Sequence, residues 1–125
     1  MSARAVLDRV REHIDKHYAK ALTVERLASM AGLSTFHFIR AFRAATGKTP
    51  HQYLRARRIE RACELLVTTP IPVTEICDAV GFQSLGSFSS LFRKLTGETP
   101  AAYRAARRRS IPIPSCFVRM YRADR

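Results

Sequence analysis

The sequence predicts an all-α protein of about seven helices, in which one short helical module occurs twice and a long helix links the two copies. Three observations predict this fold. Apolar residues recur at helical spacing along most of the chain. Helix-capping and helix-terminating residues separate the apolar segments. Residues 24–53 also align with residues 73–103, and a composition of 46% apolar and 9% aromatic residues is typical of a packed globular protein.

The two copies of the module share the residues that end helices and pack them. One residue is inserted near the start of the second helix of the later copy, so the offset between matching residues changes from 49 to 50. Two copies at so long a period form a duplicated module and not a solenoid. The matches are Val24, Leu27, Ala31 and Gly32 with Val73, Ile76, Val80 and Gly81, and then Phe38, Phe42, Arg43, Thr46, Gly47, Thr49, Pro50 and Tyr53 with Phe88, Phe92, Arg93, Thr96, Gly97, Thr99, Pro100 and Tyr103.

The first copy is predicted to begin with an amphipathic helix over residues 4–18. Thr23 is a good N-cap for the short helix that follows, and Gly32 supplies the turn after it. Ser34 caps the next helix, and Gly47 ends it. The faces expected to be buried are Val6, Leu7, Val10, Ile14 and Tyr18 on the first helix, Leu27, Ala28 and Ala31 on the second, and Phe38, Phe42 and Ala45 on the third.

A longer helix over residues 50–67 is predicted to link the copies. Thr49 can cap it, and Pro50 suits the first helical position because its missing N–H is not needed there. Pro70 and Pro72 end this helix. At 1.5 Å per residue it spans about 27 Å. Its expected buried face consists of Ile59, Ala62, Cys63 and Leu66, with Leu54 and Leu65 flanking.

The second copy repeats the pattern and ends in a helix over residues 100–108. Gly81 supplies the turn, Ser84 and Thr99 are caps, Gly97 ends a helix, and Phe88, Phe92 and Leu95 are expected in the core. A short helix, a glycine-containing turn and a second helix form the helix-turn-helix pattern. The predicted organisation is therefore a first helix-turn-helix subdomain over residues 1–49, a linking helix over 50–69, a second helix-turn-helix subdomain over 70–108 and a basic, partly apolar C-terminal tail over 109–125.

The charge of the chain predicts a polyanionic partner. Lysine and arginine number 22 against ten aspartates and glutamates, which leaves a net charge of +12. Such an excess favours nucleic acid or an anionic membrane surface. No apolar run approaches the ~20 residues of a membrane span, and the N-terminus lacks an apolar signal segment. We therefore expect a cytoplasmic protein, and because the basic chain carries two helix-turn-helix patterns, we expect its partner to be double-stranded DNA and not a membrane.

The second helix of each module presents the residues expected to contact DNA. A recognition helix reads base edges with outward side chains near its N-terminus, and arginine suits guanine while apolar groups suit the thymine methyl. The predicted base contacts are Phe36, Ile39, Arg40 and Arg43 in the first copy and Leu85, Gly86, Ser89, Ser90 and Arg93 in the second. The predicted phosphate contacts are Ser34, Thr35, His37, His51, Ser84, Ser87 and Arg104.

The two copies differ in charge. Residues 1–50 hold nine basic and four acidic side chains, whereas residues 71–100 hold two basic and three acidic ones. The tail from Ala101 holds seven basic and one acidic, so Arg104, Arg107, Arg108 and Arg109 are expected to add phosphate affinity. Because the second recognition helix also has short side chains, the first unit is predicted to anchor and discriminate, and the second to read weakly.

Two pieces of the sequence are specific: RIERACELL over residues 58–66, and the set Val80, Gly81, Phe82, Ser84, Phe88, Phe92, Arg93, Gly97, Pro100, Tyr103 and Arg104. With these pieces the chain resembles the DNA-binding domain of the AraC/XylS family of bacterial transcription regulators over about residues 6–108. The resemblance implies two recognition helices in successive major-groove segments, and an asymmetric promoter site bound by a monomer. We also expect contact with RNA polymerase. Most members carry a further effector-binding or dimerisation domain, and this chain is similar to the short stand-alone members. The base contacts that the resemblance implies are Phe36, Ile39, Arg40, Leu85, Gly86, Ser89 and Ser90. Ser90 stands where many members have arginine.

Two other classes of function were weighed. An enzyme is not predicted, because no GxSxG, HExxH, P-loop or CxxC motif occurs, and no cofactor or metal is expected. His13 and His17 are too few ligands for a metal, and a cysteine alkyl acceptor is disfavoured because Cys63 and Cys77 lie in apolar helical patterns. The alternative that stays open is a nonspecific architectural or membrane-active binder. The apolar end of the tail is expected to dock on the helices, with a ligand or partner as the other reading.

Overall fold

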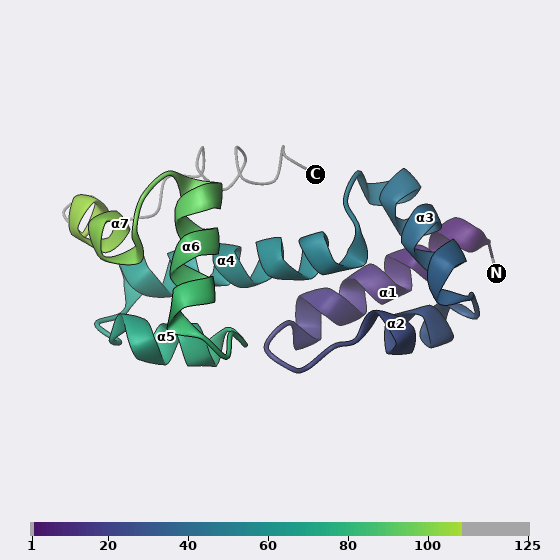
Figure 1. Cartoon of the computed structure of the whole chain (residues 1–125), viewed down its shortest axis with the longest axis horizontal. Coiled ribbons are helices and arrows are strands. Elements are labelled where there is room, and N and C mark those ends of the chain that lie inside the picture. The colour runs from purple at the N-terminus through teal and green to yellow at the C-terminus, as the bar shows by residue number, and fades with distance from the viewer. Residues whose placement is uncertain (1, 109–125) are drawn as a thin grey trace. The chain divides into compact units, whose positions relative to one another are not determined.

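The computed structural model describes residues 2–108, and over these residues the chain forms α-helices and no strand (Figure 1). The chain divides into two compact units, one ending at Arg57 and the other beginning at Arg58. The boundary falls inside the helix that was predicted as a separate linker, so each unit contains part of that helix. The helices are α1 (Ala3–His17), α2 (Val24–Ala31), α3 (Thr35–Thr46), α4 (Pro50–Thr68), α5 (Val73–Ala79), α6 (Leu85–Thr96) and α7 (Pro100–Arg107).

The capping residues determine where the helices of the first unit begin and end. The side chains of Thr23, Ser34 and Thr49 each accept a hydrogen bond of 3.2 Å from the backbone N–H three residues later. Gly32 and Gly47 end α2 and α3 in the left-handed conformation, at φ values of 71° and 82°, which glycine adopts without a steric penalty. The predicted start and end signals of this unit are confirmed.

An aromatic cluster forms the centre of the first unit. The ring centroid of Phe42 lies 5.7 Å from that of Phe38 and 5.6 Å from that of Tyr53. The Tyr53 hydroxyl donates a hydrogen bond of 2.9 Å to Oδ1 of Asp15. Arg57 lies over the Tyr18 ring and places its Nε 3.8 Å from the same carboxylate. These contacts hold the first turns of α4 against α1.

The second unit repeats this core with different partners. Phe92 lies 5.7 Å from Phe88 and 5.4 Å from Tyr103, again between centroids. Gly97 has a φ of 83°, which matches Gly47. The buried face predicted for α4 is confirmed, since all four of its residues are buried. This face consists of Ile59, Ala62, Cys63 and Leu66.

Two arginines fix α7 within the second unit. The guanidinium of Arg104 donates hydrogen bonds to the backbone carbonyls of Leu66, Thr69 and Ile71, at 3.0, 3.1 and 2.6 Å. It therefore joins α7 to the end of α4 and to the loop before α5. Arg107 contacts the Glu98 carboxylate at 2.6 Å and lies over the Tyr103 ring. Neither arginine is available as a simple surface charge.

The sequence-based prediction was wrong at the last turn of α3 and at the last turn of α6. Ala45 and Leu95 were expected in the core, but both are exposed, Leu95 by 36%. Leu91 is buried instead. The buried residues of α6 are Phe88, Leu91 and Phe92, so burial ends one turn before the helix does. The last turn of α6 therefore extends beyond the core. The expected docking of the tail concerns residues 109–125, which lie outside the described residues.

Candidate nucleic-acid interface

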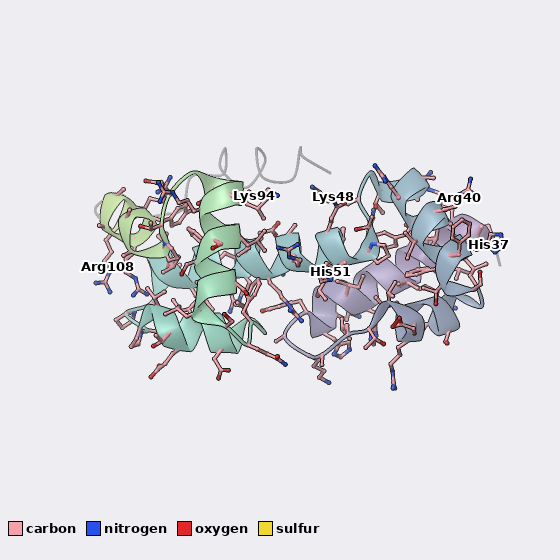
Figure 2. The ribbon with its side chains drawn as sticks, in the orientation of Figure 1. His37, Arg40, Lys48, His51, Lys94 and Arg108 are labelled. Atoms are coloured by element: carbon pink, nitrogen blue, oxygen red, sulfur yellow. The ribbon has the colours of Figure 1, made fainter. Side chains whose placement is uncertain are left out.

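Helix α3 exposes a face of one aromatic and two basic side chains. Phe36 is 66% exposed, the largest exposed fraction among the large apolar side chains of the described residues. Arg40 and Arg43 are also exposed, and Ile39 is half-buried beside them. Figure 2 shows His37 and Arg40 extending from this helix. Exposure of a large apolar side chain next to charges is typical of a contact surface.

The exposed side chains of α3 contact one another. The Cζ atom of Arg40 lies 5.5 Å from the centroid of the Phe36 ring. The His37 ring lies edge-on to the same ring, with centroids 6.2 Å apart and planes at 72°. His37 Nδ1 is 3.0 Å from Oγ of Ser34, the residue that caps the helix. A continuous set of contacts thus runs from the N-cap of α3 to Arg40.

The corresponding face of α6 has smaller side chains. At the offset of 50, Gly86 and Ser90 replace Phe36 and Arg40. Arg93 stands where Arg43 does, and both are exposed. The cap keeps the same geometry, since the Ser84 hydroxyl accepts a hydrogen bond of 3.2 Å from the Ser87 N–H. Leu85 is 45% exposed and Ser89 is half-buried.

The residues predicted to contact phosphate are of two kinds: some are accessible to solvent, and others are hydrogen-bonded within the protein. His37, His51 and Ser87 are exposed, and Thr35 is half-buried. The hydroxyls of Ser34 and Ser84 are exposed and serve as helix caps. Arg104 binds three backbone carbonyls of its own unit, so we assign it a structural role and leave it out of the interface proposed below.

Two lysines at the C-terminal ends of α3 and α6 were not selected from the sequence. Lys48 follows Gly47, the C-cap of α3, and Lys94 lies in the last turn of α6 (Figure 2). An ammonium group on a flexible stem is suited to a phosphate as a point charge. The signal that would have found them is a basic residue within a few positions of the glycine that ends each recognition helix.

A cavity of about 680 Å³ lies apart from these faces, between α1 and α2. His13 and His17 belong to its wall, with ring centroids 4.5 Å apart. Burial lowers the pKa of His13, and so do the charges of His17, Lys20 and Arg26. Within residues 2–108 no three histidine, cysteine or acidic side chains are grouped so that they could hold a metal. The other lining residues are Val6, Arg9, Val10, Glu12, Lys16, Ser29, Met30, Ala31 and Gly32.

The two cysteines of the described residues are buried, as predicted. Cys63 is 2% exposed, and burial raises the pKa of its thiol to about 12. Burial also raises the pKa of Cys77. A buried thiol that stays protonated is a poor nucleophile, which argues against alkyl transfer at Cys63. Cys116 lies outside the described residues.

Known families and structures resemble the chain over most of its length. Residues 27–106 match a family described as "Helix-turn-helix domain". The MmsAB operon regulatory protein of Pseudomonas aeruginosa is 40% identical over 98 residues, which cover 78% of this chain and 32% of that protein. The regulatory protein SoxS of Salmonella typhimurium is 34% identical over 104 residues, which cover 83% of this chain and 97% of SoxS. The chain spans 32%, 37% and 46% of the length of three of the curated relatives that it matches, the MmsAB regulatory protein among them.

The solved structures point to the same domain type. The DNA-binding domain of AdpA, described as a global transcriptional factor in complex with a target DNA, superposes with a TM-score of 0.81 at 37% identity. The match covers 87% of this chain and 98% of that one. The C-terminal domain of AraT, a response regulator of Geobacillus stearothermophilus, gives a TM-score of 0.79 at 32% identity, covering 87% of this chain and 91% of that one. No helix among residues 2–108 is long and apolar enough to cross a membrane.

Proposed function

The chain belongs to the AraC/XylS family of DNA-binding transcription regulators, and we propose that it recognises double-stranded promoter DNA with α3 and α6 as its two recognition helices. The family is one of regulators, so the chain is classed with them and not with enzymes. Because its target is chromosomal DNA, we place it in the cytoplasm. The site would be asymmetric, because the two recognition faces differ, and it would be bound by a monomer with the helices in successive segments of the major groove.

The observation that carries this proposal is the exposed face of α3. Phe36 and Arg40 lie one helical turn apart and point away from the core. Arginine donates two parallel hydrogen bonds to O6 and N7 of guanine, and an apolar ring contacts a thymine methyl. Ile39 and Arg43 extend the face on either side of this pair. In this proposal α3 supplies most of the sequence discrimination.

Helix α6 is assigned a weaker reading role. Its small residues Gly86, Ser89 and Ser90 allow close approach to the DNA but offer no bidentate donor for guanine. Arg93 and Leu85 are the longer side chains on that face. The phosphate contacts proposed for both units are Ser34, Thr35, His37, Lys48, His51, Ser84, Ser87 and Lys94.

Regulation requires a partner besides DNA, and we propose RNA polymerase for this role. A DNA-bound regulator changes transcription by contacting polymerase or by blocking it. Both actions depend first on a specific site. The nonspecific architectural alternative predicts equal affinity for every duplex of the same length.

Selection of bound fragments from random duplex DNA tests the proposal. We expect an asymmetric consensus with two parts, the stronger one read by α3. An unrelated duplex of equal length should bind at least about 10³-fold more weakly. Equal binding would favour the architectural alternative and contradict specific recognition.

A change in the DNA tests whether both helices read it together. Inserting five base pairs between the two parts of the consensus turns the second part to the opposite face of the duplex. Affinity should then drop to that of the first part alone, and a ten-pair insertion should not restore it, because α4 is one helix of fixed length. Unchanged affinity with the five-pair insertion would show a flexible connection or a single reading helix.

A further inference from the structure

We propose that Phe36 positions Arg40, so that the arginine is held in its reading geometry before DNA binds. This inference rests on the proposed function and adds a positioning residue to it. The guanidinium carbon of Arg40 lies 5.5 Å from the centroid of the Phe36 ring. A cation within about 6 Å of a ring centroid is attracted to the face of that ring. Phe36 therefore has a role besides contact with a base.

The ring of Phe36 is itself supported from the N-terminus of α3. His37 lies edge-on to it at 6.2 Å, and His37 Nδ1 is 3.0 Å from Oγ of Ser34. The Ser34 hydroxyl also caps the helix by accepting from the His37 N–H. Since the Ser34 hydroxyl is bonded to the backbone of the first turn of α3, the set of contacts begins at a fixed point of the helix. The guanidinium of Arg40 is thus linked to the helix cap through the rings of Phe36 and His37.

Positioning matters because a free arginine side chain has many rotamers to lose. Ordering such a side chain at an interface opposes binding, and a side chain that is ordered in advance avoids part of that cost. The attraction between a cation and a ring also strengthens when water leaves the contact. Close contact with bases removes this water, so the pair is stabilised where the proposed function requires it.

The second copy of the module supplies a natural comparison. Gly86 and Ser90 occupy the positions of the ring and the guanidinium, while the serine cap is retained. A Cβ atom added at Gly86 would meet its nearest neighbour, Oγ of Ser84, at 3.6 Å, an ordinary contact distance. Position 86 is exposed and accommodates a Cβ atom, so the pair can be tested on α6.

A double-mutant cycle on Phe36 and Arg40 tests the first copy. The readout is discrimination, measured as the affinity for the selected site divided by the affinity for a site changed at the guanine that depends on Arg40. Phe36→Leu keeps an apolar group for a thymine methyl but has no ring face, and we expect it to lower discrimination by about 2- to 30-fold. Phe36→Tyr keeps the ring and should restore discrimination. In the Arg40→Ala background the Phe36→Leu change should leave discrimination unaltered.

The outcomes of the cycle separate the inference from the proposed function. If Arg40→Ala abolishes discrimination while Phe36→Leu leaves it intact, Arg40 reads DNA without help and the positioning role is wrong. If Arg40→Ala itself has no effect on discrimination, the proposed function fails at this residue. Equal losses for Phe36→Leu in the parent chain and in the Arg40→Ala background would mean that Phe36 acts only by its own contact, which also overturns the inference.

Transfer of the pair to α6 tests it as a gain of function. Ser90→Arg alone, Gly86→Phe with Ser90→Arg, and Gly86→Leu with Ser90→Arg are compared by renewed selection from random DNA. We expect a new guanine preference in the second part of the site, at least about twofold stronger with phenylalanine than with leucine or glycine at position 86. Equal preference in all three variants would overturn the positioning role.

Discussion

The two units of this protein share a core and differ on the surface that faces outward from the recognition helix. In both, two phenylalanines on the recognition helix and a tyrosine on the next helix form the same cluster, with centroid separations that agree within 0.2 Å. The outward faces have diverged from an aromatic–arginine pair in α3 to glycine and serine in α6. Packing thus constrains one side of each helix, while the other side can change and leave the aromatic cluster intact.

The units also differ in how the helix after the recognition helix is held. Tyr53 of the first unit bonds Asp15 of α1, whereas Tyr103 of the second lies against the thiol of Cys63. Leu54 is buried in the first core, and its counterpart Arg104 binds three carbonyls in the second. The same backbone position is therefore stabilised by apolar burial in one unit and by hydrogen bonds in the other.

The largest expected effect is the salt dependence of the affinity for DNA, to which the more basic first unit should contribute most. With roughly 6–10 phosphate contacts, affinity for DNA should decrease by about 10³–10⁵ between 50 and 200 mM salt, because bound counterions are released. Lys48→Gln in the first unit should lower the slope of log affinity against log salt by about one. Titration by fluorescence anisotropy measures both. A flat salt dependence would contradict the DNA interface, and an unchanged slope would exclude Lys48 from it.

The second effect concerns Arg104, which stands where the first unit has Leu54. Arg104→Leu gives the second unit the residue that the first one has, but leaves three backbone carbonyls without their charged donor. We expect a loss of about 3 kcal/mol in the free energy of unfolding, measured by urea denaturation. Arg104→Lys keeps the charge without the planar fork and should lose a large part of the same amount. A loss within experimental error for Arg104→Leu would show that apolar burial serves equally well there.

The third effect compares the reading faces directly. Arg40→Ala should weaken specific binding by about 1–3 kcal/mol and relax the preference at one base pair. Ser90→Ala, at the matching position of α6, should change affinity little. Competition binding against the selected site measures both variants. Equal losses would mean that the second unit reads DNA as strongly as the first, which would remove the proposed division of roles.

The smallest expected effect concerns the two matching tyrosines. Tyr53→Phe removes a hydrogen bond to a carboxylate and should cost about 1 kcal/mol of stability. Tyr103→Phe removes a hydroxyl that contacts a thiol, a weak partner, and should cost less. Thermal unfolding of the two variants, compared with the parent chain, gives the order. A larger loss for Tyr103→Phe would show that the thiol contact is the stronger one.

Local sequence signals sufficed for the helices, because each cap acts within three or four residues. The predicted helix over residues 4–18 was found at Ala3–His17, and the one over 50–67 at Pro50–Thr68. The outward face of α3 could be predicted from its period, and even the contact between Phe36 and Arg40 follows from their spacing of four. Whether these residues touch DNA stays a prediction.

Interactions over long sequence separations could not be predicted. Arg104 was assigned to phosphate because it lies in a basic segment, yet its partners are 33 to 38 residues away. No pattern in the sequence marks those carbonyls as unsatisfied without the arginine. The burial of Ala45 and Leu95 was wrong for a related reason, since helical period gives the side of a helix but not how far along it the core extends.

The boundary between the two units lies within α4, at Arg57 and Arg58. Residues 55–58, on either side of this boundary, are half-buried, whereas residues 53–54 and 59–60 are buried. Helical backbone with little burial opens more readily than helix that is packed in a core. The amide protons next to the boundary should therefore exchange with solvent faster than those in the buried parts of α4.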